Sequence, residues 1–431
     1  MKQLITKTKI YQRVKKIFSP FYKQKIISKI FSILEKDFPK DKKVAMFVGG
    51  CVRKYICNEE IDDIDIATIL TPEEVKKKFE GTGIKVLDTG IEHGSVTLAY
   101  KDNKFEITTL RKDIKTDGRH AQISFTDDWQ LDSERRDFTI NAIYLDRKGK
   151  IFDPQLGLKD LQNGVIKFIG DPGKRIEEDF LRIIRFIRFA IEYKHKTFES
   201  STIEAIKLNL NGIKNLSKER IFNELTKIFK LKNLYEILES KELLEIFNLI
   251  FPELKEMNHI SKLSSIRENQ SLKIDTDLIL SSILVTDTKD YEYFCHKYKV
   301  SNSTKDKMIF LANIFEKYKS EKLFFTKYLN KKIYFYGKEN LKEFVIFLYL
   351  KNKNFKQLDL LELTKKIEKF TTPNFPFNGK YLQKKGIKQG KIMGKTLKQL
   401  ESAWIENDFS LSDQRANEII KKANKLNVLN I

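Results

Sequence analysis

Residues 44–68 of the chain read VAMFVGGCVRKYICNEEIDDIDIAT, and this stretch decides the fold. Two short runs, VAMFV and DIDIAT, are rich in apolar and β-branched residues and typical of strands, and the run between them predicts a helix that begins near Val52. Gly49 and Gly50 end the first strand, where glycine lets backbone N–H groups approach a phosphate and a helix N-terminus attracts anions. Arg53 adds a positive charge beside them. The stretch therefore predicts a phosphate-binding turn between a strand and a helix.

Asp63 and Asp65 stand two residues apart in the second run, so on a strand both carboxylates point to the same face. Two carboxylates side by side repel each other, and a cation bound between them removes this repulsion. Mg²⁺ prefers oxygen ligands and is commonly held by one or two carboxylates plus substrate phosphates. An Asp-x-Asp pair alone is more typical of a solvated strand face, but beside the glycine turn it predicts metal-assisted attack on a nucleotide phosphate. Glu106, in the later run KFEITTL, is either a third carboxylate near the metal or a structural partner of Arg111.

Arginine-rich segments follow the predicted strands. Arg135, Arg136 and Asp137 open RRDFTINAIYL. Guanidinium groups match phosphate oxygens bidentately, so this segment suits a triphosphate, with Asp137 accepting a hydrogen bond from a ribose hydroxyl. A surface cluster of ion pairs at the start of a helix is an equally good interpretation.

A second such segment, residues 178–189, reads EDFLRIIRFIRF. Helical spacing places Asp179 beside Arg182, and the ordinary interpretation is an amphipathic helix with routine ion pairs. The functional interpretation is that aspartate accepts and arginine donates, which complements the amino group and ring nitrogen of cytosine or adenine. Guanine and uracil present donor and acceptor groups in the opposite order at the same edge of the base. One such pair would select C and A at roughly 1–3 kcal/mol of discrimination.

Composition limits the classes of protein to consider. The 431-residue chain carries 81 Lys and Arg against 59 Asp and Glu, a net charge of +22. This charge attracts polyanions, with nucleic acid as the first candidate and an acidic membrane surface as the alternative. The three cysteines show no Cys-x-x-Cys spacing, which argues against a disulfide framework or a structural zinc. Because no apolar run approaches the ~20 residues that span a bilayer, we expect a cytoplasmic protein with no membrane association.

Two kinds of sequence pattern divide the chain. Residues 44–152 contain strand-like runs such as SVTLAY and KFEITTL, whereas almost everything from Ile176 onward has helical spacing. This predicts an α+β head followed by helical domains. Residues 1–34 are rich in Lys and contain no acid, which predicts a basic helical arm rather than an organelle transit peptide.

Four motifs, in this order, resemble those of the class II tRNA nucleotidyltransferase (CCA-adding enzyme) and bacterial poly(A) polymerase family. They are the glycine turn at 49–53, the pair Asp63 and Asp65, the segment 135–142 (RRDFTINA) and the segment 178–185 (EDFLRIIR). Further segments are similar to other parts of the family: 153–161 and 219–225 to its neck motifs, 109–125 to its flexible loop, and 375–409 to the tail of some bacterial members.

The resemblance implies a polymerase-beta-like nucleotidyltransferase head, then an all-helical neck, body and tail. We place these domains at residues 29–150, 151–230, 231–370 and 371–431, after a basic arm at 1–28. The implied cofactor is Mg²⁺, the implied substrates are CTP and ATP, and the implied partner is tRNA. Asp63 and Asp65 are the implied catalytic and metal-binding residues. The implied nucleotide-binding residues are Gly50, Arg53 and Arg136 for the triphosphate, Asp137 for the ribose, and Asp179 and Arg182 for the base, supported by Arg185 and Arg188.

The leading hypothesis is template-independent addition of CCA to tRNA 3′ ends by two-metal nucleotidyl transfer. Poly(A) polymerase and a partial CC- or A-adding enzyme share these motifs and stay open. An inactive RNA-binding module predicts a lost carboxylate, and none is lost. One position departs from the family pattern: Lys54 stands where an acid usually follows Val-Arg, which bears on the orientation of Arg53. The spacing to Asp63 is intact, and the oligomeric state is left open.

Overall fold

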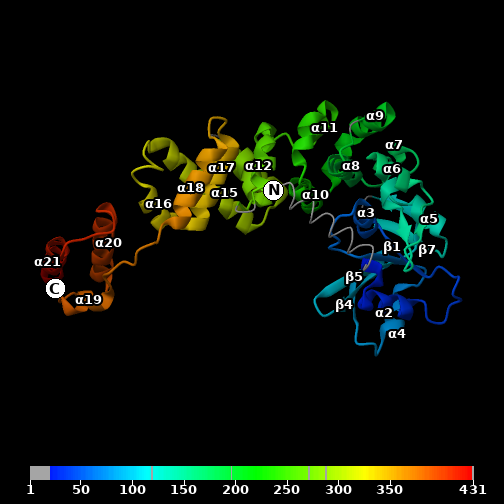
Figure 1. Ribbon diagram of the computed structural model, residues 1–431, viewed down its shortest axis with the longest axis horizontal. Coiled ribbons are helices and arrows are strands. Elements are labelled where there is room, and N and C mark those ends of the chain that lie inside the picture. Colours follow the sequence, from blue (N-terminus) through cyan, green and yellow to red (C-terminus); the bar gives the residue numbers. More distant parts are fainter. Residues whose placement is uncertain (1–19, 118–119, 196, 270–271, 287–288, 430–431) are drawn as a thin grey trace. The chain divides into compact units, whose positions relative to one another are not determined.

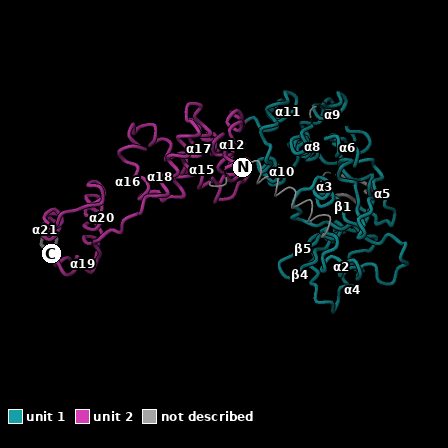
Figure 2. The backbone as a smooth tube through the Cα atoms, viewed as in Figure 1, with its two compact units in different colours: residues 1–252 teal, residues 253–431 magenta. Residues whose placement is uncertain are grey.

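The computed structural model describes residues 20–117, 120–195, 197–269, 272–286 and 289–429 (Figure 1). The chain divides into two compact units, Met1–Pro252 and Glu253–Ile431 (Figure 2). Residues 1–19 of the predicted N-terminal arm lie outside the described residues, and its last residues form the short helix η1 (Phe21–Lys23) and the start of α2 (Lys25–Leu34). The predicted α+β head followed by helices is confirmed.

The head contains a seven-stranded sheet of order β3-β4-β5-β2-β1-β8-β9. Only β2 and β5 pair in parallel among its described neighbours, and the other pairs are antiparallel. The strands are β1 (Ala45–Val48), β2 (Asp65–Thr68), β3 (Lys85–Gly90), β4 (Ser95–Tyr100), β5 (Asn103–Thr109), β8 (Tyr144–Leu145) and β9 (Ile151–Phe152), with a separate hairpin of β6 (Arg111–Asp117) and β7 (His120–Phe125).

Strand β1 lies at the centre of the head core because all four of its residues are buried. Its side chains alternate between the two faces of the sheet. Phe47 packs against Phe31 of α2, with ring centroids 4.7 Å apart, while Met46 and Val48 join a cluster with Trp129 on the other face. Burial on both faces fixes the register of β1, and with it the position of the glycine turn that follows.

The rest of the first unit is helical. Its helices are α3 (Gly50–Cys57), α4 (Pro72–Phe79), α5 (Trp129–Glu134), α6 (Gly157–Asn163), α7 (Pro172–Glu178), α8 (Leu181–Glu192), α9 (Ser200–Asn209), α10 (Lys218–Lys230) and α11 (Lys241–Ile250). Helix α8 packs against α10 and buries an apolar face that includes Ile183, Ile184 and Ile187. This face was expected from the helical spacing of the sequence.

The continuous helix predicted over residues 178–189 is wrong at its start. Helix α7 ends at Glu178, and Asp179 is extended, with φ −157° and ψ 104°. The reason is local hydrogen bonding: the Asp179 carboxylate accepts from the N–H of Leu181 at 3.1 Å, and its carbonyl accepts from the N–H of Arg182 at 3.0 Å. An aspartate that satisfies the free N–H groups at a helix start favours a new helix there over a continuous one.

The second unit is helical throughout its described part. Its helices are α12 (Leu263–Arg267), α13 (Thr276–Leu284), α14 (Asp290–Tyr298), α15 (Asn302–Ser320), α16 (Leu329–Tyr336), α17 (Lys338–Lys351), α18 (Gln357–Lys369), α19 (Gly379–Lys384), α20 (Lys391–Glu406) and α21 (Asp413–Leu429). Residues 344–350 of α17 are all buried, and α19–α21 build a smaller core around Leu382 and Leu400. No described helix is both long and apolar enough to cross a membrane.

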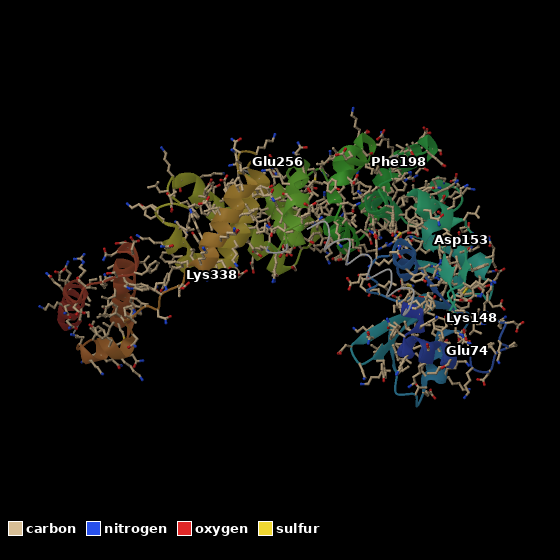
Figure 3. All side chains as sticks on the ribbon, in the orientation of Figure 1. Glu74, Lys148, Asp153, Phe198, Glu256 and Lys338 are labelled. Atoms are coloured by element: carbon tan, nitrogen blue, oxygen red, sulfur yellow. The ribbon has the colours of Figure 1, made fainter. Side chains whose placement is uncertain are left out.

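Gly157 fixes the contact between helix α6 and the RRDFTINA segment. A Cβ at Gly157 would lie 2.0 Å from the carbonyl oxygen of Thr139, far inside van der Waals contact. Asp153, labelled in Figure 3, accepts from the N–H groups of Gly157 and Leu158 at 2.8 Å each, and Thr139 donates to Asp160 at 2.6 Å. The backbone therefore has little freedom to move away from an added methyl group.

We expect Gly157→Ala to lower the free energy of unfolding by about 1–3 kcal/mol, the usual cost of overpacking. Urea unfolding followed by circular dichroism measures this. Gly394→Ala is the matched control, because Gly394 lies inside α20 with open space around it, and there alanine adds helix propensity of up to ~1 kcal/mol. Equal stability of Gly157→Ala and the parent would contradict the close approach.

Candidate active site

A cavity of about 590 Å³ opens in the first unit between the sheet and the segments around α7 and α8. It is bounded by the glycine turn through Val48 and Gly49, and by the strands through Ser95 and Thr108. Acidic and basic side chains share its lining, which includes Asp65, Glu106, Glu178, Asp179, Arg111, Arg135, Arg136, Arg182 and Arg220. The cavity is therefore strongly polar, and both the strands and the helical segments contribute carboxylates and arginines to it.

The acidic edge of the cavity is formed where β2 and β5 run in parallel. Strand β2 begins at Asp65, so Asp63 lies just before the strand and not within it as predicted. Asp65 pairs in register with Glu106. Burial and the charges of Glu106 and Asp63 together raise the pKa of Asp65 to about 6, against the opposing charges of Arg136 and Arg53. Glu106 and Asp63 therefore both repel the charge of Asp65.

This donor set fits a divalent cation that takes part of its coordination from a substrate. In the part of the chain that the structure describes, no three His, Cys, Asp or Glu side chains lie close enough to hold a metal ion by themselves. Proteins usually bind Mg²⁺ with one or two carboxylates and leave the remaining positions to phosphate and water. The mutual repulsion at Asp65 is the cost that such a cation removes.

The glycine turn lies directly beside the acidic edge. Gly49 has φ 73°, a conformation that glycine adopts easily, and a Cβ there would lie 3.6 Å from Oδ2 of Asp65. Helix α3 begins at Gly50, two residues before the predicted start, because the Gly49 carbonyl already accepts the first helical hydrogen bond, from the N–H of Arg53 at 3.1 Å. The N-terminus of α3 and the carboxylate of Asp65 therefore meet at the cavity.

Lys54 does not line the cavity and pairs with Asp62. The hydrogen bond from Lys54 is the main cause that lowers the pKa of Asp62. The same carboxylate accepts from the N–H of Asp63 at 3.0 Å. Lys54 therefore tethers the segment that carries Asp63, through its neighbour.

For the nucleotide incorporation that the motif resemblance implies, we expect Lys54→Asp to change the rate by less than about tenfold, since exposed ion pairs contribute only ~0.2–1 kcal/mol. The exchange of both charges, Lys54→Asp with Asp62→Lys, restores the attraction and should restore the parent rate. Single-turnover incorporation on a tRNA substrate measures both. A change above a hundredfold would show that Lys54 takes part in the reaction itself.

Arg135 and Arg136 are fixed by Asp132, a fully buried carboxylate that the sequence interpretation missed. Arg135 donates to Asp132 at 2.8 Å and Arg136 at 3.0 Å, and the Tyr144 hydroxyl donates at 2.7 Å. Burial penalises the charge of Asp132, but the charges of Arg136 and Arg135 outweigh this and hold its pKa far below the ordinary range. The acid three and four residues before the arginine pair was a visible sequence pattern for this anchor.

The predicted base-selecting residues Asp179 and Arg182 both line the cavity, but their side chains pair with other residues and not with each other. Asp179 accepts from Arg220 of α10 at 2.7 Å. Arg182 donates to Glu178 at 2.5 Å and to the carbonyl of Arg175 at 2.6 Å. Arg220 also lines the cavity, and within the segment 219–225 nothing in the sequence singled it out.

Six other predicted site residues do not line the cavity. Gly50 follows the lining residue Gly49, and Asp63 lies two residues before Asp65. The remaining four are Arg53, Asp137, Arg185 and Arg188. Arg53 and Asp137 are each only 9% exposed. Arg185 donates to Asp137 at 2.7 Å, and Arg188 donates at 2.9 Å to Glu224, a buried carboxylate of α10. The structure thus brings these four together as an internal network.

Comparison with protein-family models gives three matches in chain order. Residues 45–167 match the poly A polymerase head domain. Residues 197–258 match the probable RNA and SrmB-binding site of polymerase A, and residues 271–415 match a putative tRNA nucleotidyltransferase domain 2. The first match contains the glycine turn and the acidic edge described above.

Solved structures share the fold. The Bacillus stearothermophilus CCA-adding enzyme in complex with CTP has a TM-score of 0.69 and 22% identity, over 95% of this chain and 100% of that one. The Thermotoga maritima CCA-adding enzyme complexed with tRNA_CCA has a TM-score of 0.59 and 20% identity, over 93% of this chain and 95% of that one.

Curated relatives match over nearly their whole length. The human mitochondrial CCA tRNA nucleotidyltransferase 1 is 31% identical over 96% of this chain and 94% of its own. The CCA-adding enzyme of Ligilactobacillus salivarius is 33% identical over 89% of this chain and 92% of its own. This chain therefore belongs to the family of CCA-adding tRNA nucleotidyltransferases.

Proposed function

We propose that this protein adds CCA to the 3′ ends of tRNA from CTP and ATP without a nucleic-acid template. The observation that carries the proposal is the cavity, which places an acidic edge and arginine forks at one nucleotide-sized site together with Asp179 and Arg182. Its volume of about 590 Å³ falls within the 300–1,000 Å³ usual for small-molecule sites. The net charge of +22 supports tRNA as the partner.

The acidic edge is the proposed site of phosphoryl transfer. Asp63 and Asp65 hold divalent ions, which we propose to be Mg²⁺ because the donors are all carboxylate oxygens. When bound, Mg²⁺ supplies the charge that activates the RNA 3′-hydroxyl and neutralises the departing pyrophosphate. Glu106, in register with Asp65, adds negative charge at the same point and strengthens cation binding.

Gly50 and three residues of the cavity lining bind the nucleotide. Gly50, at the N-terminus of α3, and Arg136, held toward the cavity by Asp132, bind the triphosphate. Asp179 and Arg182 select the base. Contacts from Arg53 to the triphosphate or from Asp137 to the ribose would require these side chains to leave buried partners. We assign them, with Arg185 and Arg188, the role of holding the cavity wall in place.

Sequencing the products made on a tRNA that lacks its 3′ CCA tests the proposal. With CTP and ATP together, we expect two cytidines followed by one adenosine and then no further addition. A run of adenosines would assign the protein as a poly(A) polymerase, and addition of only CC or only A would assign a partial enzyme. RNA binding without any product would favour an inactive RNA-binding module.

We also propose a cytoplasmic location, on the likeness to the bacterial CCA-adding enzymes, although other relatives are mitochondrial. Cell fractionation with an antibody against the chain tests this, and recovery of the protein in an organelle fraction would overturn it.

A further inference from the structure

A single asparagine, Asn141, joins two buried charged side chains behind the cavity. Its Oδ1 accepts a hydrogen bond from Nη1 of Arg53, and its Nδ2 donates to Oδ1 of Asp137 at 2.6 Å. Asn141 is 5% exposed, so water does not substitute for these partners. Neither the motif resemblance nor the cavity lining assigns a role to its side chain.

The two partners of Asn141 lead to opposite ends of the proposed site. Arg53 lies on α3, the helix that starts at the glycine turn beside Asp65, and its Nε donates to the Tyr193 hydroxyl at 3.1 Å. Asp137 accepts from Arg185 of α8 at 2.7 Å. Helix α8 is the element that carries Arg182, and it begins two residues after Asp179.

The chemistry at this position requires an amide. A guanidinium offers only donors and an ionised carboxylate only acceptors, so a group between Arg53 and Asp137 must accept at one end and donate at the other. A carboxylate in place of Asn141 would face Asp137 with a second negative charge. An apolar side chain would remove one hydrogen-bond partner from each of two buried charged groups, which is costly in a region of low dielectric.

We propose that Asn141 is a positioning residue that fixes helix α8, and with it the base-selecting residues at its start, relative to the metal-binding edge of the sheet. The proposal rests on the proposed function. The backbone carbonyl of Asn141 also accepts from Nη1 of Arg136, at 3.5 Å, which links the triphosphate-binding arginine to Asn141 as well. A change at Asn141 therefore moves the reacting phosphate and the base relative to each other.

The test compares Asn141→Asp, Asn141→Ser and the matched control Asn233→Asp. Serine keeps a donor and an acceptor in a smaller volume, so it preserves folding while loosening the link. Asn233 donates to the carbonyls of Ile191 and Glu192 at the far end of α8, so its change disturbs the same helix away from the site. The measurements are kcat and KM for CTP and ATP on a tRNA substrate, the ratio of CTP to UTP incorporation, and the melting temperature.

We expect Asn141→Asp to lower kcat by about 10–100-fold, the usual effect of small misplacements at a reacting centre. The CTP preference over UTP should fall as well, with Asn141→Ser intermediate in both. Asn233→Asp should keep the parent kcat and the parent preference even if its melting temperature falls. The selectivity ratio is the readout that a purely structural role would not change.

Folded Asn141 variants with the parent kcat and selectivity would overturn the proposal. So would failure of both variants to fold at a temperature where Asn233→Asp is folded, because Asn141 would then serve stability alone. Failure of the parent protein itself to incorporate CTP and ATP would instead overturn the proposed function, so the two failures are distinguishable.

Discussion

An Asp65→Asn variant is expected to lose nucleotide incorporation and, in metal-free buffer, to become more stable than the parent. The loss follows from removal of a carboxylate that the proposed mechanism needs for cation binding. The gain follows from the burial of the Asp65 carboxylate and, after it, from repulsion by Glu106 and Asp63, which together raise its pKa from 3.8 to about 6. A shift of about two units corresponds to at most about 3 kcal/mol, at ~1.4 kcal/mol per unit.

The direction of the pH dependence follows from the raised pKa. The folded protein binds the Asp65 proton more tightly than the unfolded chain does, so this group favours folding below pH 3.8 and loses that contribution as the pH rises through about 6. The metal-free parent therefore carries the full penalty at pH 7.5. Mg²⁺ binding removes the penalty, so Mg²⁺ should raise the melting temperature of the parent more at pH 7.5 than at pH 5.

Calorimetry with and without Mg²⁺, at both pH values, measures these effects beside an incorporation assay. Asp102→Asn is the matched control, since Asp102 is an exposed acid in the turn between β4 and β5 and should change neither stability nor activity. Asp63→Asn should lose activity as Asp65→Asn does. Retention of more than a few per cent of the parent activity in either variant would contradict the two-carboxylate assignment.

The acidic edge could be predicted from sequence because short-range rules determine it. The apolar run that follows Asp65 predicted a buried strand that begins there, and the glycine pair required a tight turn just before the helix. The sequence left Glu106 either as a third carboxylate near the metal or as a structural partner of Arg111. The parallel pairing of β2 and β5 puts Glu106 opposite Asp65, which favours the first interpretation. No spacing rule gives the pairing of strands that lie forty residues apart.

The partners of the arginines could not be predicted either, because they also depend on contacts between residues far apart in the sequence. A guanidinium pairs with whichever carboxylate the tertiary fold brings near, and Arg220 reaches Asp179 from 41 residues away. Arg53 and Asp137 looked like ligand contacts because their charges stand in nucleotide-binding motifs. Packing of α8 against the head buries them instead and leaves Asn141 to join them.

Removal of either base-selecting side chain should reduce discrimination more than turnover. In the proposed arrangement Asp179 accepts from the amino group of cytosine or adenine, and Arg182 donates to the ring nitrogen. Arg220 and the N–H of Leu181 occupy Asp179 only in part, because an ionised carboxylate has about four acceptor positions. Glu178 holds Arg182 in place, so both side chains are preorganised for a base.

Asp179→Ala and Arg182→Ala should therefore incorporate UTP and GTP better, relative to CTP, than the parent does. A lost bidentate partner forfeits roughly 1–3 kcal/mol, which is about 5- to 150-fold in the ratio of rates at ~1.4 kcal/mol per tenfold. The acidic edge is untouched in both variants, so the rate with the best substrate should fall less than this ratio. Single-nucleotide incorporation on a tRNA that ends before its CCA, with each triphosphate tested separately, measures both quantities.

Glu177→Ala is the control for this experiment, because Glu177 is an exposed acid in the last turn of α7 that does not line the cavity. It should keep the parent rate and the parent preference. If Asp179→Ala and Arg182→Ala lose activity but keep the preference for C and A, the two residues only support the start of α8. Base choice would then have to come from other groups of the cavity, and Arg220, the remaining charged donor beside Asp179, would be the first to test.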